Sequence, residues 1–251
     1  MLPLIRGLLF QVGFIGSILV FGLLVPPLIW PFSRPVRYRV LTQWGRFNIW
    51  WLRMTCGIDY RVRGAEHIDP SRPHVVLSKH QSAWETVAFV AIFPMQTWVL
   101  KRELMRIPVF GWTLAMIDPV PIDRDAGRKA LENLVAEGQQ RLDEGRWVIV
   151  FPEGTRVAPG EHGRYRQGGA MLAARTGYPV LPVALNSGSF WPKKGIRRYP
   201  GTIEVVIGAP IETAGRKPVE VLNEAEEWIE TTMAGIEPRP AKPSAEKPNG
   251  Q

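Results

Sequence analysis

A histidine and a carboxylate at short spacing are the first residues in this chain that could do chemistry. Residues 78–85 read SKHQSAWE and follow an apolar run. Histidine is the side chain whose ordinary pKa suits proton transfer near neutral pH. A carboxylate bonded to its other ring nitrogen would fix the tautomer and stabilise the imidazolium. His80 and Glu85 are therefore a candidate catalytic pair, in which His80 would be a general base for a hydroxyl supplied by the substrate.

The same spacing also has a purely structural interpretation. Ser82 followed three residues later by Glu85 fits a capping box, in which both side chains bond the first turn of a helix. The two interpretations can coexist, because each keeps Glu85 near the segment that carries His80.

A second segment with chemical potential follows another apolar run, where residues 151–156 read FPEGTR. Pro152 and Gly154 favour a turn, and glycine lets the backbone approach a ligand closely. Thr155 offers a hydroxyl, and the planar guanidinium of Arg156 matches a phosphate. The alternative is an ordinary surface turn with a solvated arginine.

The elements that must position these segments alternate after residue 58. Short β-rich runs are expected as strands at 74–78, 97–100, 120–122, 147–151, 179–184 and 203–207. Helical patterns lie at 82–93, 126–144, 165–176 and 219–234, and Gly177 is a plausible helix cap. This alternation predicts an α/β domain with a central, largely parallel sheet flanked by helices. Ligands bind beyond the carboxyl ends of such strands, where both segments fall.

The N-terminal part predicts a membrane anchor. Residues from Gly7 to Val25 carry no charge and suit the thickness of a bilayer, and Pro26 and Pro27 are expected to end or kink this helix. Residues 36–56 form an amphipathic pattern that suits the headgroup layer or, alternatively, packs on the domain. A hairpin in one leaflet is also compatible with this pattern. Because arginines follow the apolar run, the positive-inside rule places the bulk of the chain on the cytoplasmic face of the inner (cell) membrane.

Composition narrows the classes of partner. The net charge is +8 and the sequence pI is about 9.9, which indicates nucleic acid, anionic lipid or a phosphorylated substrate. No nucleic-acid motif is present and the arginines cluster beside the membrane segment, so nucleic acid is not expected. The single cysteine, Cys56, excludes an intramolecular disulfide, and the histidines show no metal-ligand spacing, so no metal is expected.

Five blocks, in order and spacing, resemble the glycerolipid acyltransferase family, and within it the 1-acyl-sn-glycerol-3-phosphate (lysophosphatidic acid) acyltransferases. They are His80 with Glu85, KREL at 101–104, IDR at 122–124, FPEGTR at 151–156 and VLPV at 180–183. The resemblance covers roughly residues 74–185. The family pattern more often has Asp at position 85 and Asn at position 79, so this chain departs from it at Glu85 and Lys79.

The resemblance implies a role for each matching residue. His80 would be the base and Glu85 would orient it. Lys101 and Arg156 would hold the phosphate of the acceptor. The remaining substrate-binding residues would be Phe151, Glu153, Gly154 and Thr155, with the last three shaping the glycerol site. Residues 180–183 would lie near the acyl-chain path, and the IDR block would be structural.

The implied reaction moves a fatty acyl group from acyl-CoA or acyl-carrier protein to the free hydroxyl of lysophosphatidic acid, giving phosphatidic acid in phospholipid biosynthesis. No cofactor and no covalent intermediate are expected, because a thioester is already activated. Anionic membrane lipid is the expected surrounding. The implied organisation is a membrane anchor at 1–58, an acyltransferase domain at 59–236 and a disordered tail at 237–251.

Three alternatives remain open from the sequence. One is acylation of another lysolipid, such as a lysophospholipid with a larger headgroup or a lyso-ornithine lipid. Another is a lipid hydrolase with Ser82 as nucleophile, although no Gly-x-Ser-x-Gly elbow is present. The third is a non-catalytic membrane adaptor that only binds lipid phosphate.

Overall fold

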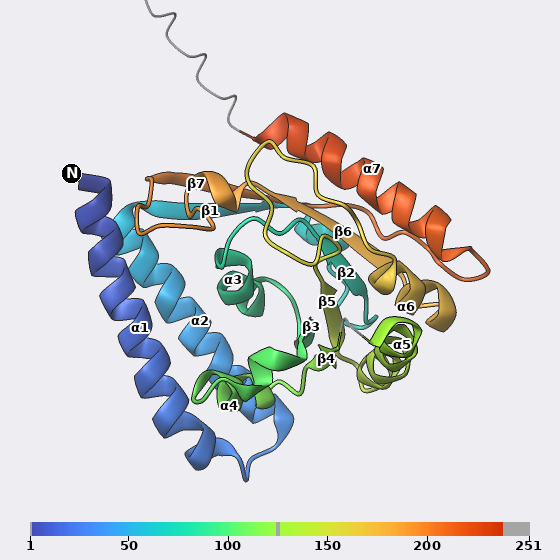
Figure 1. Cartoon of the computed structure of the whole chain (residues 1–251), viewed down its shortest axis with the longest axis horizontal. Coiled ribbons are helices and arrows are strands. Elements are labelled where there is room, and N and C mark those ends of the chain that lie inside the picture. Colours follow the sequence, from blue (N-terminus) through green and yellow to red (C-terminus); the bar gives the residue numbers. More distant parts are fainter. Residues whose placement is uncertain (1, 124–125, 238–251) are drawn as a thin grey trace, which may run out of the picture.

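A seven-stranded sheet with helices on both faces forms the centre of the computed structural model, which describes residues 2–123 and 126–237 (Figure 1). The strand order is β1-β7-β6-β2-β5-β3-β4. Neighbouring strands are parallel except for β6 and β7, which are antiparallel. The expected α/β fold with a largely parallel sheet is confirmed.

The strands match the apolar runs of the sequence, with one addition. They are β1 (Ile58–Arg63), β2 (Val75–Ser78), β3 (Gln96–Lys101), β4 (Val120–Ile122), β5 (Trp147–Val150), β6 (Val180–Leu185) and β7 (Gly201–Ile207). Every residue of β2, β5 and β6 is buried, which explains why these strands read as continuous apolar runs. The sequence did not predict β1, because this edge strand alternates with charged residues.

Seven α-helices surround the sheet in the described residues. They are α1 (Leu2–Ile29), α2 (Arg34–Cys56), α3 (Trp84–Ile92), α4 (Phe110–Ala115), α5 (Gly127–Asp143), α6 (Gly168–Thr176) and α7 (Pro218–Ile236). The short α4 was not predicted. The expected cap of α6 is confirmed, since Gly177 has a φ of 75° and donates its N–H to Ala173 O. Arg124 and the tail from residue 238 lie outside the described residues.

The helices divide between the two faces of the sheet (Figure 1). On one face, Leu52 of α2 and Phe89 of α3 share a buried cluster with Ile149 of β5. On the other face, Leu172 of α6 and Val221 of α7 share a second cluster with the adjacent strand residue, Val148. Because successive residues of a strand point to opposite faces, β5 contributes to both cores.

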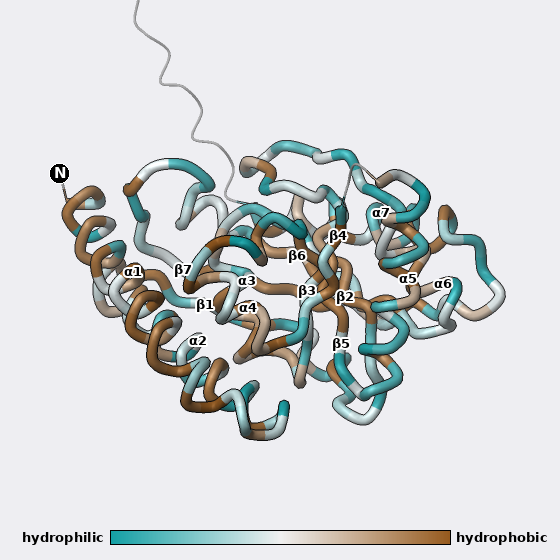
Figure 2. Tube along the Cα trace, turned by 60° about the horizontal axis from the view of Figure 1, so that its bottom comes forward, coloured by the Kyte–Doolittle hydropathy of each residue, from teal (hydrophilic) through white to brown (hydrophobic). Residues whose placement is uncertain are grey.

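The N-terminal helix α1 is apolar along its length and lies beside α2 (Figure 2). In the described part of the chain it is the one helix long and apolar enough to cross a membrane, with 11% of its most apolar window buried. Its buried Phe10 belongs to the same cluster as Ile149 of the sheet, so α1 packs on the domain while most of its apolar surface stays exposed. A helix of this kind indicates membrane association.

The two prolines do not end α1, which was one of the two effects expected of them. The helix continues through Pro26 and Pro27 to Ile29, and Trp30 donates its N–H to Pro26 O at 2.9 Å. Proline removes its own N–H from the ladder but leaves its carbonyl free to accept, so the bonds of the following residues close the last turn.

Helix α2 packs on the domain with one side, as one interpretation of its pattern predicted, and its place in the headgroup layer stays a prediction. Its face toward the domain buries Leu41, Gly45 and Leu52, and the opposite side leaves Trp50 and Met54 exposed. Of the aromatic and apolar stripe expected from the sequence, Trp51 packs against the buried core cluster and Met54 is exposed, so the stripe is split between the core and the surface.

We predict that Gly45→Ala weakens the packing of α2 on α3. A Cβ at this position would clash with Val90 and lie 2.8 Å from Val87 O, which belongs to the α3 backbone and cannot move independently. Overpacking of this kind costs about 1–3 kcal/mol, so the apparent melting temperature should fall. Gly16→Ala in α1 is the matched control, because nothing lies within 4 Å of its added Cβ. Equal melting temperatures for the two variants would contradict the packing described here.

Candidate functional site

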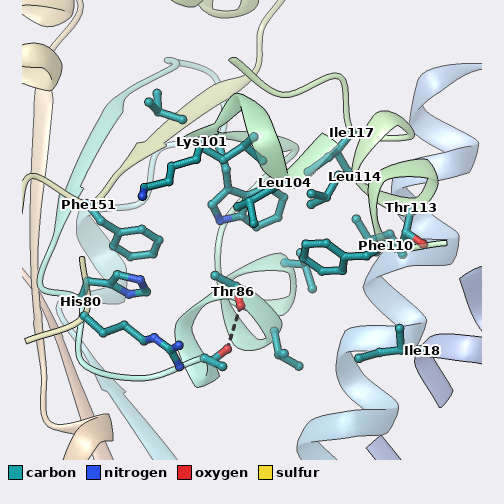
Figure 3. A pocket seen from close by; sticks show the side chains of 18 of the residues that line it. Ile18, His80, Thr86, Lys101, Leu104, Phe110, Thr113, Leu114, Ile117 and Phe151 are labelled. Carbon is teal, nitrogen blue, oxygen red and sulfur yellow. Dashed lines mark hydrogen bonds between the residues drawn. The ribbon is translucent and has the colours of Figure 1, made fainter. Parts of the chain in front are cut away.

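The sheet brings the candidate residues together at the carboxyl ends of three neighbouring strands. His80 follows β2, the FPEGTR segment follows β5, and Lys101 ends β3, and β5 pairs in parallel with both of the others. His80, Lys101 and Arg156 line one cavity of about 530 Å³. Figure 3 shows that Lys101 and His80 approach this cavity from different elements.

The walls of the cavity away from these polar groups are apolar. They come from α1, α2, α3, η2 (Arg102–Arg106) and α4, and they include Phe14, Ile18, Val90, Leu104 and Leu114 (Figure 3). Such a cavity suits a ligand with a long hydrocarbon part and one charged end.

The imidazole of His80 is held by stacking and by a carboxylate. Its ring lies on Phe151 with centroids 3.9 Å apart and planes 14° apart. Its Nδ1 lies 3.8 Å from Glu85 Oε2, which is longer than a hydrogen bond, and this nitrogen makes no hydrogen bond among the described residues. Separations of this kind often shorten when substrate binds.

Glu85 is fully buried, and its carboxylate holds the segment that carries His80. Oε1 accepts the N–H of Gln81 at 2.9 Å, the N–H of Ser82 at 3.0 Å and the hydroxyl of Ser187 at 2.6 Å. The loop between β2 and α3 has no neighbouring strand to pair these amides, so the carboxylate supplies the acceptor.

Glu85 forms one half of the expected capping box, and its catalytic role stays a prediction. Glu85 reaches back to Ser82 N as in a capping box, but Ser82 Oγ accepts the N–H of Trp84 at 3.0 Å. The helix therefore starts at Trp84, two residues later than expected, and the carboxylate still faces His80.

Burial moves the pKa values of the pair in opposite directions. It raises the pKa of Glu85 to about 7, although the hydrogen bonds from Ser187 and the loop amides act against it. Burial, together with the positive charges of Arg156 and Lys193, lowers the pKa of His80 to about 3. His80 is therefore neutral at physiological pH and able to accept a proton.

Lys193 is a site residue that the sequence did not reveal. It follows η4 (Ser187–Ser189), and its Nζ donates to Arg156 O at 2.6 Å and to Thr155 Oγ1 at 3.4 Å. No motif marks this lysine, because its contacts join positions 37 and 38 residues apart. It places a second positive charge beside Arg156.

Not every expected residue lines the cavity. Phe151, Gly154 and Thr155 do, but Glu153 is buried behind the loop, where it accepts the backbone N–H of His80 at 3.4 Å. Residues 180–183 lie inside the fully buried strand β6, away from the cavity lining. Among the described residues, no group of three or more His, Cys, Asp or Glu side chains is placed to hold a metal ion.

Comparison with known proteins gives consistent matches. The Acyltransferase family matches residues 59–186. A 1-acyl-sn-glycerol-3-phosphate acyltransferase of Pseudomonas aeruginosa is 44% identical, over 98% of this chain and 96% of the relative. The alpha form of the same enzyme from Bos taurus is 33% identical, over 66% of this chain and 58% of the relative.

A solved structure supports the fold over nearly the whole length. The crystal structure of the 1-acyl-sn-glycerophosphate (LPA) acyltransferase PlsC from Thermotoga maritima superposes with a TM-score of 0.71, at 24% identity, and covers 94% of this chain and 97% of that one. At this identity the likeness shows the fold alone.

We predict that Ser187→Ala raises the pKa of Glu85. The hydroxyl bonds the ionised carboxylate in a buried setting, and the loss of such a charge-assisted bond shifts a pKa by about 1 unit or more. The measurement is a carbon NMR titration of labelled glutamate carboxyls in the detergent-solubilised full chain, with the signal assigned by its absence in Glu85→Gln.

Ser189→Ala is the matched control in the same turn, because Ser189 donates its backbone N–H to Asn186 O and the substitution leaves this bond in place. The control should leave the titration midpoint in place. A midpoint that also stays in place for Ser187→Ala would show that this hydroxyl does not stabilise the Glu85 carboxylate.

Proposed function

The chain belongs to the 1-acyl-sn-glycerol-3-phosphate acyltransferase family, and from this premise we propose that it acylates lysophosphatidic acid to phosphatidic acid in phospholipid biosynthesis. The acyl donor would be acyl-CoA or acyl-carrier protein. One observation carries the proposal: a neutral histidine, basic side chains and an apolar wall meet in a single cavity. These are the groups that an anionic lipid with a reactive hydroxyl requires.

The cations would bind the phosphate of the acceptor. Arg156 offers a planar fork, and Lys101 and Lys193 add ammonium groups from β3 and from the loop after η4. The acyl chain of the acceptor would lie along the apolar wall formed with α1, α2 and α4. Phosphate and chain together would set the free hydroxyl beside His80.

The chemistry follows from the position of the imidazole. Because Nδ1 of His80 faces Glu85, Nε2 is the nitrogen left to take the proton from the hydroxyl. The alkoxide attacks the thioester carbonyl, the carbon–sulfur bond breaks, and the departing thiolate takes the proton back from His80. The Glu85 carboxylate stabilises the imidazolium in between.

Acceptor binding would also improve the base. Burial is the main cause of the low pKa of His80, and the charges of Arg156 and Lys193 add to it. A bound phosphate offsets these charges, so the basicity of His80 rises when an anionic acceptor is in place. This coupling favours a phosphorylated acceptor over a neutral one.

The N-terminal helices would anchor the enzyme at the cytoplasmic face of the inner membrane. The outer surface of α1 is apolar, and α2 carries arginines along its length. Residues of α1, including Phe14 and Phe21, line the cavity, which favours an anchor lying against one leaflet over a helix crossing the bilayer. Anionic lipid would then surround the opening through which the acceptor enters.

The first test is a transfer assay. Membranes containing wild type or His80→Ala are given labelled acyl thioester and lysophosphatidic acid. Wild type should make phosphatidic acid, and the variant should be slower by about 10²–10⁴-fold, the usual contribution of a general base. Full turnover by the variant would remove His80 from the mechanism. If wild type acylates a different lysolipid and not lysophosphatidic acid, acyl transfer is retained as the reaction but the proposed acceptor is wrong.

A second test concerns Lys193. Lys193→Gln should raise the KM for lysophosphatidic acid by about tenfold, because one charge-assisted contact to the phosphate is lost. The KM for the acyl donor should not change. Lys194→Gln is the matched control, since this neighbouring lysine is also exposed but does not share the hydrogen bonds of Lys193 to Thr155 and Arg156. A raised donor KM with an unchanged acceptor KM would assign Lys193 to the donor instead.

A further inference from the structure

Lys79 is a buried charged residue that the mechanism above does not use. Its side chain is 1% exposed, although it immediately precedes His80. Its Nζ donates to Glu230 Oε1 at 2.7 Å and to Glu161 O at 3.2 Å, and it lies 3.7 Å from Glu153 Oε1. A buried ammonium is costly unless it is paired and hydrogen-bonded, so these partners define where Lys79 can lie.

One of these partners touches the catalytic segment directly. Glu153 Oε1 accepts the backbone N–H of His80 at 3.4 Å. Burial raises the pKa of Glu153 to about 7, while the charge of Lys79 acts in the opposite direction and Glu230 adds to the rise. Tyr165 faces the same carboxylate from the segment before α6. Lys79 is thus the nearby cation that favours the ionised form of Glu153, the carboxylate that accepts the backbone N–H of His80.

The other partner belongs to the C-terminal helix. Glu230 lies on α7 and also accepts the hydroxyl of Tyr165 at 2.8 Å. On the other side of His80, Gln81 Nε2 donates to Glu237 Oε1 at 2.5 Å, just after the end of the same helix. The two sequence neighbours of His80 are therefore both held at the C-terminal end of α7, Lys79 by Glu230 and Gln81 by Glu237.

We propose that Lys79 is a positioning residue for acyl transfer, which joins Glu230 of α7 to Glu153 of the FPEGTR segment and so fixes the backbone that presents His80. The inference rests on the proposed function. It also accounts for the departure of this chain from the more frequent Asn at position 79, because a lysine is long enough to reach α7.

The kinetic test uses Lys79→Met and Glu230→Gln in the full chain. Lys79→Met should lower kcat by about 10–100-fold, because small displacements of a reacting group cost rates of this order, and the KM of both substrates should stay within about twofold. Without the ammonium the pKa of Glu153 rises further, so kcat should recover as the pH is raised. Glu230→Gln should also lower kcat, by a smaller factor than Lys79→Met.

Glu227→Gln is the matched control, since this exposed carboxylate lies on the same helix three residues before Glu230. It should behave as wild type. A role limited to holding α7 in place predicts a loss of the same factor at every pH. That result, or wild-type kinetics for Lys79→Met, would overturn the proposal.

A second measurement does not depend on turnover. Hydrogen exchange of the amides in residues 79–85 should be faster in Lys79→Met and Glu230→Gln than in wild type, and unchanged in Glu227→Gln. Faster exchange confined to α7, with residues 79–85 unchanged, would overturn the positioning role. If wild type makes no phosphatidic acid, the proposed function fails by itself, and the exchange result still decides whether Lys79 positions the segment.

Discussion

The arrangement of the site depends on one buried carboxylate. The segment after β2 leaves the sheet before α3 begins, so its amides have no ladder to join. Glu85 supplies the acceptor and binds the N–H groups of Gln81 and Ser82, together with the hydroxyl of Ser187 from the loop after β6. One side chain therefore fixes the backbone on which His80 lies and ties together the ends of two neighbouring strands. Burying this carboxylate is costly, and the converging donors offset the cost.

The same burial sets the chemistry. Burial, together with nearby positive charges, lowers the pKa of His80 to about 3, so His80 stays neutral, and burial raises the pKa of Glu85 to about 7. Charges act strongly in such surroundings, so Arg156 and Lys193, which we propose bind the phosphate, also lower the pKa of the imidazole. In the proposed mechanism, recognition of the acceptor and activation of its hydroxyl are therefore coupled by electrostatics. Behind the segment, Lys79 and Glu153 form a second layer of support that links it to α7.

Most of the strands and several of the site residues could be predicted from the sequence. The physical reasons for these predictions also explain why the other residues could not be found. The strands β2, β5 and β6 are buried on both faces and read as apolar runs, and the parallel-sheet rule then brings His80, Lys101 and Arg156 to one edge. The edge strand β1 has an exposed face and lacks that signal. Ser187 and Lys193 could not be found, because their contacts with the site depend on the tertiary path of the loop after β6 and not on local spacing.

The most direct test of the account is the turnover of Glu85→Gln with lysophosphatidic acid and an acyl thioester. The amide keeps the size of the side chain but replaces one acceptor oxygen with a donor that faces other donors, and it removes the charge beside the imidazole. We expect kcat to fall by about 100-fold or more, with the KM of the acceptor little changed. A variant that turns over within about twofold of wild type would contradict the claim that this carboxylate organises the site.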